Sequence, residues 1–490
     1  MEEKRELKRS LGLLDATSLV AGSMIGSGIF LVSSDMARDL GSAGWLIAAW
    51  LLTGVITLIA ALSYGELAGM MPEAGGQYVY IQRAFGKFTS FLYGWTVFAV
   101  IQTGVIAAVA MAFANYTAEL LPIFSAKHIL LQLGSFSITA QQVLAVTLIV
   151  FLTFINTLGV KSGAGVQKIF TSAKLLALFG LIIFGLVVGL KTHVFGTNFT
   201  DAWNATRTEK VEGQGIISHW NTMPIGGITL LAVFGLTLMN SLFSSDAWNN
   251  VTFIAGEIKE PQKNIPKSLF LGTLIVTLLY ISANLAYLAL LPLKGNPDGA
   301  DVVSKGMQFA EMGRVGTAAA TMIFGNVATV MMALLIMVST FGCNNGIILA
   351  GARLYYAMAK DGLFIRRATQ LNRFSVPSFA LWIQCIWAGL LCFSGTYHDL
   401  VIYCTFASML FYIVTIGGLF VLRKKEPQTL RPYKAFGYPA LPALYILLAI
   451  AICVNLLFMD TRNSIAGIII VAVGVPVYFI QKALSKQSGN

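Results

Sequence analysis

Twelve apolar stretches, each long enough to cross a bilayer, constrain this chain more than any other feature. Their centres fall near residues 25, 55, 103, 149, 178, 238, 278, 332, 386, 410, 448 and 473, and a membrane core takes about 20 apolar residues. The stretches are continuous rather than alternating, which favours helices over a β-barrel. Only 11% of the residues are charged. We therefore predict an all-α polytopic membrane protein with twelve transmembrane helices.

The net charge of +11 follows the topology of the predicted spans. With the N-terminus inside, 23 of the 33 Lys and Arg residues fall on the cytoplasmic side, as the positive-inside rule requires. We predict a multi-pass protein of the plasma membrane with both termini cytoplasmic, lipid around it and no nucleic acid partner. The first apolar run is too long for a signal peptide and lacks an A-x-A cleavage site, so it is kept as a span.

The residues give no sign of an enzyme or a metal protein. Neither HExxH, GxSxG nor a P-loop occurs, and a membrane enzyme would need convergent His, Asp or Ser groups at one depth. A channel would need a polar stripe along several helices. All five cysteines fall within predicted spans, which supports neither a disulfide framework nor a metal cluster. We predict no enzyme activity, no cofactor and no metal.

Two spans carry helix breakers at matching positions. The first span reads GSMIGSG at 22–28 and the sixth contains FSSDAWNN at 243–250; glycine costs roughly 1 kcal/mol relative to alanine in a helix. Paired interruptions in corresponding spans point to a transporter site built on inverted repeats. Taken alone, the first break is equally well explained as a packing notch formed by Gly22 and Gly26. The second break favours unwound helices.

This pairing sets the predicted organisation of the chain, with the first ten spans as two repeats of five. The segments are a cytoplasmic leader (1–10), a first repeat (11–190), an outer loop (191–225), a second repeat (226–422), a cytoplasmic loop (423–436), two appended spans (437–485) and a cytoplasmic tail (486–490).

Unwound backbone at membrane depth is tolerated only where it lines a cavity or is buried in protein. The free N–H groups that begin a half-helix attract anions, and freed carbonyls accept from cations. Such a site suits a zwitterion. We expect the amides of Ser27 and Gly28 to hold a carboxylate, and the carbonyls of Met24, Phe243 and Ser244 to hold an amine.

Several motifs resemble those of the amino acid–polyamine–organocation superfamily and, within it, the L-type amino acid transporter family. The likeness covers residues 10–430 and rests on GSMIGSGIF, SYGELAGMMPEAGGQYVY (63–80), FTSAK (170–174), FSSDAWNN, GEIKEPQKNIPKSL (256–269) and NGIILAGARLYYAMAKDG (345–362). It implies the LeuT fold, alternating access and sodium-independent exchange of amino acids. It also implies that Met24, Phe243 and Asp246 offer carbonyls to the amine, and that the Phe243 ring closes the site from outside. The substrate-binding residues that we predict are Met24, Ile25, Gly26, Ser27, Gly28, Phe243, Ser244, Ser245 and Asp246.

The sequence departs from the family in the sixth span, where Ser244 and Ser245 precede Asp246 and Ala247 replaces a glycine. The small serines favour neutral amino acids, whereas Asp246 leaves cationic ones open; Asp246 alternatively caps the second half-helix. Animal members pair with a glycoprotein through a cysteine between spans three and four. Residues 118–138 contain none, so no disulfide-linked heavy chain is expected and the chain resembles a stand-alone prokaryotic member.

Lys174 lies about nine residues into the fifth span and matches the lysine of the family motif. The resemblance implies that its ammonium stands where sodium sits in sodium-coupled relatives, bridging span one to span eight. Alternatively it couples transport to a proton, or is a structural lysine. We predict a coupling or gating role for Lys174 and Phe243. The predicted activity is exchange of neutral L-amino acids; the alternative is proton-coupled uptake of amino acids, including cationic ones, or of a polyamine, which lacks a carboxylate for Ser27 and Gly28.

Overall fold

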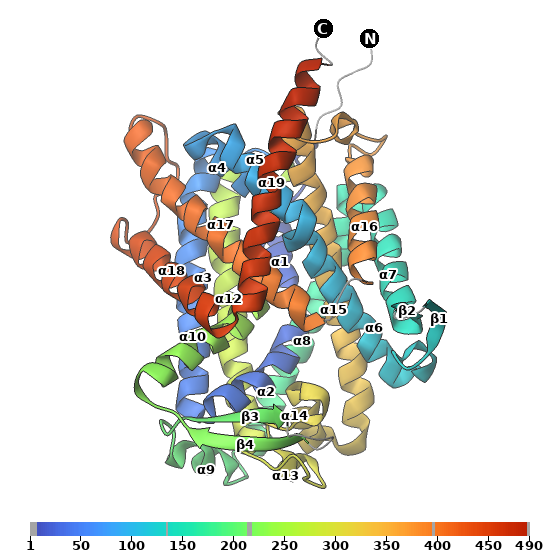
Figure 1. Cartoon of the computed structure of the whole chain (residues 1–490), viewed down its shortest axis with the longest axis vertical. Coiled ribbons are helices and arrows are strands. Elements are labelled where there is room, and N and C mark those ends of the chain that lie inside the picture. The colour runs from blue at the N-terminus through green and yellow to red at the C-terminus, as the bar shows by residue number, and fades with distance from the viewer. Residues whose placement is uncertain (1–6, 134–135, 213–217, 394–396, 488–490) are drawn as a thin grey trace.

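The computed structural model describes residues 7–133, 136–212, 218–393 and 397–487 as a bundle of long helices (Figure 1). The predicted leader and tail lie partly outside these residues. Ten helices in the described part of the chain are long and apolar enough to span a membrane: Ala43–Met70, Lys87–Leu120, Ala140–Thr157, Gly163–Gly189, Gly227–Ser244, Pro261–Leu290, Val315–Lys360, Cys404–Lys425, Ala440–Met459 and Thr461–Ala483. A bent helix pair at the N-terminal end adds an eleventh.

The predicted helical fold is confirmed, with one difference in the count of spans. Eleven of the twelve predicted centres fall on the spans above. The remaining one, near residue 386, falls on α16 (Ser378–Leu391), an apolar helix of only 14 residues. That length is below what a straight bilayer crossing needs, so the ninth predicted span is a shorter helix.

Both predicted breaks are present. The first span consists of α1 (Leu13–Met24) and α2 (Gly28–Leu40), bent by 40° at the residues between them. In the sixth, α10 (Gly227–Ser244) stops at the polar stretch and a short α11 (Asn250–Phe253) follows. Ala247 lies between them at φ 63°, a left-handed conformation that costs a residue with a Cβ roughly 1–2 kcal/mol.

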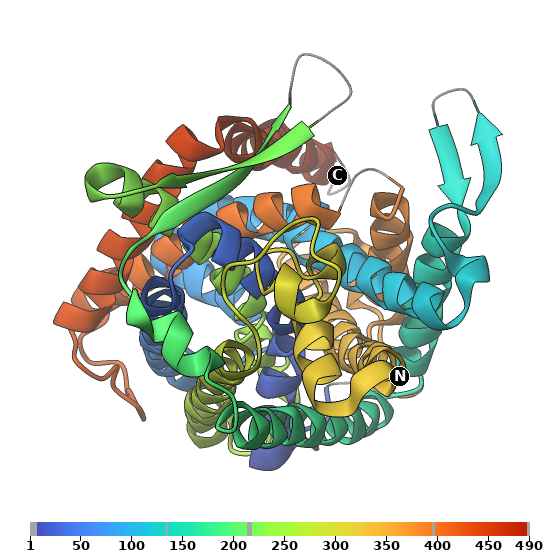
Figure 2. The ribbon, with the colours of Figure 1, turned by 90° about the horizontal axis from the view of Figure 1, so that it is seen from below.

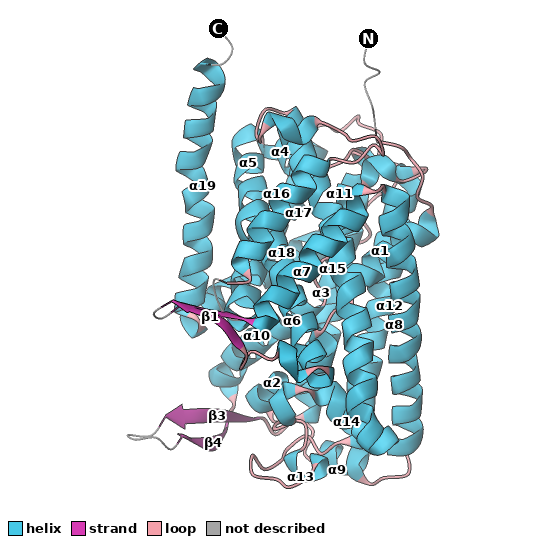
Figure 3. Cartoon of the chain, turned by 90° about the vertical axis from the view of Figure 1, so that its right-hand side faces the viewer, coloured by secondary structure: helices cyan, strands magenta, loops and turns pink. Residues whose placement is uncertain are grey.

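Further helices, some long and some short, build the rest of the bundle. They are α3 (Ala43–Met70), α4 (Gln77–Phe85), α5 (Lys87–Thr96), α6 (Gln102–Leu120), α7 (Ala140–Thr157), α8 (Val160–Gly189), α12 (Pro261–Leu290), α14 (Val315–Phe324), α15 (Ala328–Lys360), α17 (Tyr397–Lys425), α18 (Ala440–Met459) and α19 (Thr461–Gln487). A π-helical turn at Val97–Ile101 joins α5 to α6, and such turns occur often at functional sites. Helix α1 packs against α8, α12 and α15, which run alongside it in Figure 3.

Two antiparallel hairpins depart from the all-α prediction. One pairs β1 (Ile129–Leu133) with β2 (Phe136–Thr139), and the other pairs β3 (Thr206–Glu212) with β4 (Ser218–Pro224). Both lie at the periphery of the bundle in Figure 2. The β3–β4 hairpin shares one end of the molecule with two short helices, α9 (Val194–Thr200) and α13 (Val302–Lys305), while α4 and α5 lie at the other end (Figures 1 and 3).

Candidate functional site

The break between α1 and α2 is held by a lysine from α8. Lys174 is 1% exposed, and its Nζ donates to the carbonyls of Gly22 at 2.5 Å, Ile25 at 2.6 Å and Ser339 at 3.4 Å. The ammonium thus joins the break to α15, which carries Ser339, as the resemblance implied. A buried cation bonded to carbonyls replaces the helical hydrogen bonds that the break gives up.

Side chains from α12 and α15 donate hydrogen bonds to the other carbonyls of the break. Ser339 Oγ lies 3.1 Å from the oxygens of both Ile25 and Gly26, and Cys343 Sγ lies 3.0 Å from that of Ser23. The Tyr280 hydroxyl lies 3.0 Å from the oxygen of Met24. Each carbonyl from residue 22 to 26 therefore has a side-chain donor.

The amides at the start of α2 differ from these carbonyls, because they lack a hydrogen-bond partner in the described residues. Among the described residues, the N–H groups of Ser27 and Gly28 have no acceptor. Gly28 also leaves no room for a side chain, because a Cβ there would lie 2.8 Å from Ser244 Cβ. The head of a 13-residue helix with open amides attracts a carboxylate.

The three glycines of the motif have different surroundings. A Cβ at Gly22 would lie 3.2 Å from Gln167 Cδ, so this glycine permits close packing of α1 on α8, as the notch interpretation required. At Gly26 the nearest atom would be Cys343 Sγ, at an ordinary 3.5 Å. Gly22 thus fits the packing-notch interpretation of the motif, whereas Gly28 fits the interpretation as an unwound helix.

The second break is built from side chains rather than backbone. The Tyr412 hydroxyl donates to Asp246 Oδ1 at 2.5 Å. Asn249 Nδ2 and the Tyr93 hydroxyl both donate to Gln77 Oε1 at 3.0 Å. The position that precedes α11 is Asn249, not Asp246, so the capping interpretation of Asp246 is wrong: the turn after α10 is longer than the sequence indicated.

Tyr280 connects the two breaks. Its hydroxyl lies 3.0 Å from Met24 O and 3.1 Å from Ser244 O, and its ring meets Trp50 edge-on at 5.4 Å between centroids. Since a carbonyl has two lone pairs, both oxygens keep one acceptor position. The structure thus brings two of the carbonyls predicted to hold an amine to the same hydroxyl. The third, Phe243 O, accepts from the amide of Asp246 at 3.1 Å.

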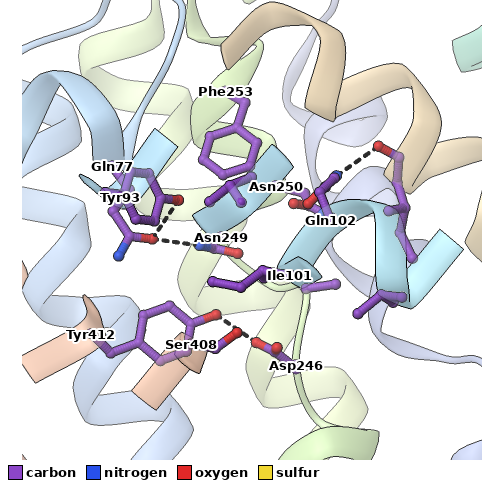
Figure 4. A pocket seen from close by; sticks show the side chains of 14 residues that line it. Gln77, Tyr93, Ile101, Gln102, Asp246, Asn249, Asn250, Phe253, Ser408 and Tyr412 are labelled. Atoms are coloured by element: carbon purple, nitrogen blue, oxygen red, sulfur yellow. Dashed lines mark hydrogen bonds between the residues drawn. The ribbon is translucent and has the colours of Figure 1, made fainter. Parts of the chain in front are cut away.

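A cavity of about 30 Å³ lies beside the second break, and Figure 4 shows the side chains that line it. Asp246 lines it and also borders a second cavity of about 20 Å³, where Ser245 lies. Asn250 Nδ2 and Ser408 Oγ are buried and have no hydrogen-bond partner among the described residues. Such orphaned polar atoms are costly unless a ligand or water meets them. Ser27 and Gly28 do not line this cavity.

The α4–α5 end of the bundle is fastened by ion pairs. Arg353 Nε on α15 lies 3.0 Å from Glu257 Oε1, just beyond α11, and both side chains are at most 2% exposed. Arg423 Nη2 on α17 lies 2.6 Å from Glu66 Oε2 on α3. The amides of Ser10 and Leu11 donate to Glu257 O. These contacts join the segment before α1 and the segment after α11 to each other and to α15, and they join α3 to α17.

Sequence reasoning missed four residues of this region. Tyr280, Cys343, Tyr412 and Gln77 occur singly within apolar spans or next to them, without a spacing that marks them. From the sequence, Cys343 argues only against a disulfide framework, as a cysteine within a predicted span. Among them, only Gln77 lies inside a motif that carried the resemblance.

Comparison with known proteins identifies relatives of this chain over nearly its whole length. Residues 11–479 match the model of a family described as amino acid permease. The chain is 30% identical to large neutral amino acids transporter small subunit 2 of Mus musculus, over 97% of this chain and 81% of that protein. It is 29% identical to the serine/threonine exchanger SteT of Bacillus subtilis over 98% of both chains. Identity to Asc-type amino acid transporter 1 of Mus musculus is 28%, over 98% of this chain and 82% of that protein.

Proposed function

The chain belongs to the amino acid permease family, whose members are transporters rather than enzymes, and from that premise we propose that it exchanges neutral L-amino acids by alternating access without sodium. The relatives are named for neutral amino acids, for serine and threonine exchange and for Asc-type amino acids. Identities near 30% leave coupling and substrate to be argued from this chain's own residues.

The substrate's common part binds between the two breaks. Its carboxylate meets the amides of Ser27 and Gly28, which have no other acceptor in the described part of the chain. Its ammonium takes the open lone pairs of Met24 O and Ser244 O, which Tyr280 holds on one hydroxyl. Backbone contacts of this kind recognise any amino acid, because every amino acid carries both groups.

The contacts of Lys174 support the proposal that transport does not require sodium. Its ammonium already supplies a positive charge to Gly22 O, Ile25 O and Ser339 O, and hard carbonyl oxygens are what a bound sodium ion would require. A fixed cation at this place removes the need for a transported one. Lys174 then holds α1 against α15, and Phe243, at the end of α10, closes the site on the other side of the substrate.

The side chain of the substrate enters the cavity at the second break, where Asp246, Asn250 and Ser408 offer both donors and acceptors. The cavity is small, and this favours short neutral side chains. Asp246 is already engaged by Tyr412, which weakens the case for a cationic substrate.

The orientation that we propose has both termini in the cytoplasm of a cell whose plasma membrane holds the protein. The α4–α5 end carries the ion-paired Arg353 and Arg423, with Lys424 and Lys425 at the end of α17, as expected of a cytoplasmic side. The β3–β4 end then faces outward.

Counterflow in proteoliposomes tests the proposal. Vesicles loaded with an unlabelled neutral amino acid should accumulate labelled L-serine whether or not sodium is present, and empty vesicles should not. Uptake into empty vesicles driven by a pH gradient alone would replace exchange by proton coupling through Lys174. A requirement for sodium would refute the role given to the Lys174 ammonium.

A further inference from the structure

The two hairpins of the structure differ in charge. Strand β3 reads TRTEKVE and contains four charged side chains, whereas β1 reads ILLQL and β2 reads FSIT, without any. Lys127 is the only Asp, Glu, Lys or Arg between Glu119 and Lys161. Charged side chains keep an exposed strand edge in solution, so the β1–β2 hairpin lacks the chemistry of a hairpin that stands in water.

The side chains of β1 are uncovered on both faces of the hairpin. Successive residues of a strand point to opposite faces, and Ile129, Leu130 and Leu131 are 51%, 61% and 48% exposed. Leu121 and Ile123, between α6 and β1, are 53% and 64% exposed. Figure 2 shows the hairpin projecting from the side of the bundle. An antiparallel hairpin in water usually buries one face, whereas this one presents apolar side chains outward in both directions.

The connection to α7 sets the depth of the hairpin. Strand β2 ends at Thr139, which is the N-cap of α7 and accepts from the amide of Gln142. Helix α7 has 18 residues, hence a length of about 27 Å, and the hydrocarbon core is about 30 Å thick. A crossing of the core therefore uses all of α7 and leaves Thr139 at its edge. Figures 1 and 3 agree, since they show this hairpin nearer to the middle of the bundle than β3–β4.

The exposed side chains of the hairpin continue a surface that faces lipid. On α7, a membrane-spanning helix, the exposed large side chains Val143, Val150, Phe151 and Phe154 are all apolar. The backbone of a two-stranded ribbon has unpaired edge groups, which the hydrocarbon core does not tolerate. The boundary between headgroups and acyl chains satisfies both requirements, because it offers apolar contact and water together.

We infer that the β1–β2 hairpin is an interfacial anchor, which lies in the bilayer leaflet on the β3–β4 side with Ile129, Leu130 and Leu131 among the upper acyl chains. Lys127, two residues before β1, extends to the lipid phosphates, as long basic side chains do at this boundary. The anchor fixes the adjoining ends of α6 and α7 in the membrane. Helix α6 carries Gln102, which lines the cavity at the second break, so one wall of that cavity is tied to the bilayer. The inference needs the membrane-spanning fold but not the proposed substrate.

Fluorescence quenching tests the anchor in the full-length protein in phosphatidylcholine nanodiscs, where both faces of the membrane meet the solvent. The five native cysteines are buried, so bimane can be attached to a single introduced cysteine. Leu130→Cys carries the probe on β1, and Val211→Cys, at a position 38% exposed on β3, is the matched control. Lipids with brominated acyl chains should quench the Leu130→Cys probe about twofold or more above the control, and aqueous iodide should quench it about twofold or more below the control.

Two results would overturn the anchor. Equal iodide quenching at both positions would place the β1–β2 hairpin in water. A Leu130→Cys probe shielded from both quenchers only in discs that hold two copies would assign this face to a second copy of the chain.

A second pair of variants separates lipid insertion from mere shape. Leu131→Asp, added to the Leu130→Cys protein, should raise iodide quenching of the probe about twofold, because a charge is costly among acyl chains. Leu131→Ile should leave it unchanged. Unchanged iodide quenching in the Leu131→Asp protein would refute insertion of β1 into the leaflet.

Discussion

The two breaks meet at one hydroxyl, that of Tyr280, but they are built in different ways. At the first, side chains from three helices hold every carbonyl from residue 22 to 26, whereas the amides of Ser27 and Gly28 have no acceptor in the part of the chain that the structure describes. At the second, side chains bond to one another, two buried donors have no partner among the described residues, and Ala247 has a left-handed backbone. Under the proposed function, the comparison separates a backbone site for what all amino acids share from a side-chain site for what distinguishes them.

The largest effect that would test this division comes from Gly28→Val. A Cβ at Gly28 would lie 2.8 Å from Ser244 Cβ and 3.1 Å from Ser244 Cα, and the branched side chain would cover the open amides. Overpacking costs about 1–3 kcal/mol and each 1.4 kcal/mol is a factor of ten, so transport-site affinity for L-serine should fall by about 100-fold. Equilibrium binding measures this loss.

Gly26→Ala is the matched control. It adds a methyl group to the same break, but the nearest atom would be Cys343 Sγ at 3.5 Å, so affinity should stay within about twofold, as expected for an ordinary contact. Equal losses in the two variants would show that the break tolerates no side chain anywhere, and the special role of Gly28 would be withdrawn.

The second test removes the cation that holds the first break. Lys174→Ala leaves Gly22 O without a donor, at a cost of about 1–3 kcal/mol for a buried acceptor, and counterflow should fall about tenfold or more. Lys168→Ala, on the same helix with its side chain 54% exposed, should transport normally. Counterflow measured with and without sodium decides the reason: if sodium restores the Lys174→Ala variant, the ammonium stands in for that ion, whereas normal transport in the variant removes Lys174 from the mechanism.

The predictability of the site followed the same division. The first break was predictable because glycines inside an apolar run conflict with helix propensity. Lys174 was predictable because placing a charge within a span costs free energy and therefore indicates a function. Tyr280 and Cys343 were not, because a tyrosine or cysteine in a span is compatible with plain packing, and only the folded chain shows which carbonyl it meets. The error at Asp246 came from the turn, whose left-handed Ala247 delays the helix start to Asn250. The hairpin β3–β4 lies in the polar segment that we predict to be an outer loop, where the sequence shows no clear alternation.

A third test perturbs the second break alone. Tyr412→Phe removes the hydroxyl that donates a hydrogen bond to Asp246 Oδ1 at 2.5 Å. The Asp246 carboxylate is then free to contact the substrate's side chain. A hydrogen bond contributes about 0.5–1.5 kcal/mol, so the affinity ratio of L-serine to L-alanine should change about three- to tenfold, while affinity for glycine, which has no side chain, should not. Tyr445→Phe, in the adjoining second cavity, serves as the control. Competition binding that shows all three amino acids shifting together would assign the Asp246 region to the common part of the substrate.

The smallest expected effect concerns the strain at the second break. Ala247→Gly relieves a left-handed backbone worth about 1–2 kcal/mol, of which glycine's own flexibility takes back about 0.5–1 kcal/mol, so the apparent melting temperature in detergent should rise by about 1 °C. Ser375→Gly, at φ 59° in a loop outside both breaks, should give a similar rise. The two variants should differ in function: a looser turn at Ala247 should alter L-serine affinity about twofold, while Ser375→Gly should leave it unchanged. Identical affinities would mean that the second break does not depend on its turn geometry, and selectivity would then rest on the side chains of Asp246, Asn250 and Ser408 alone.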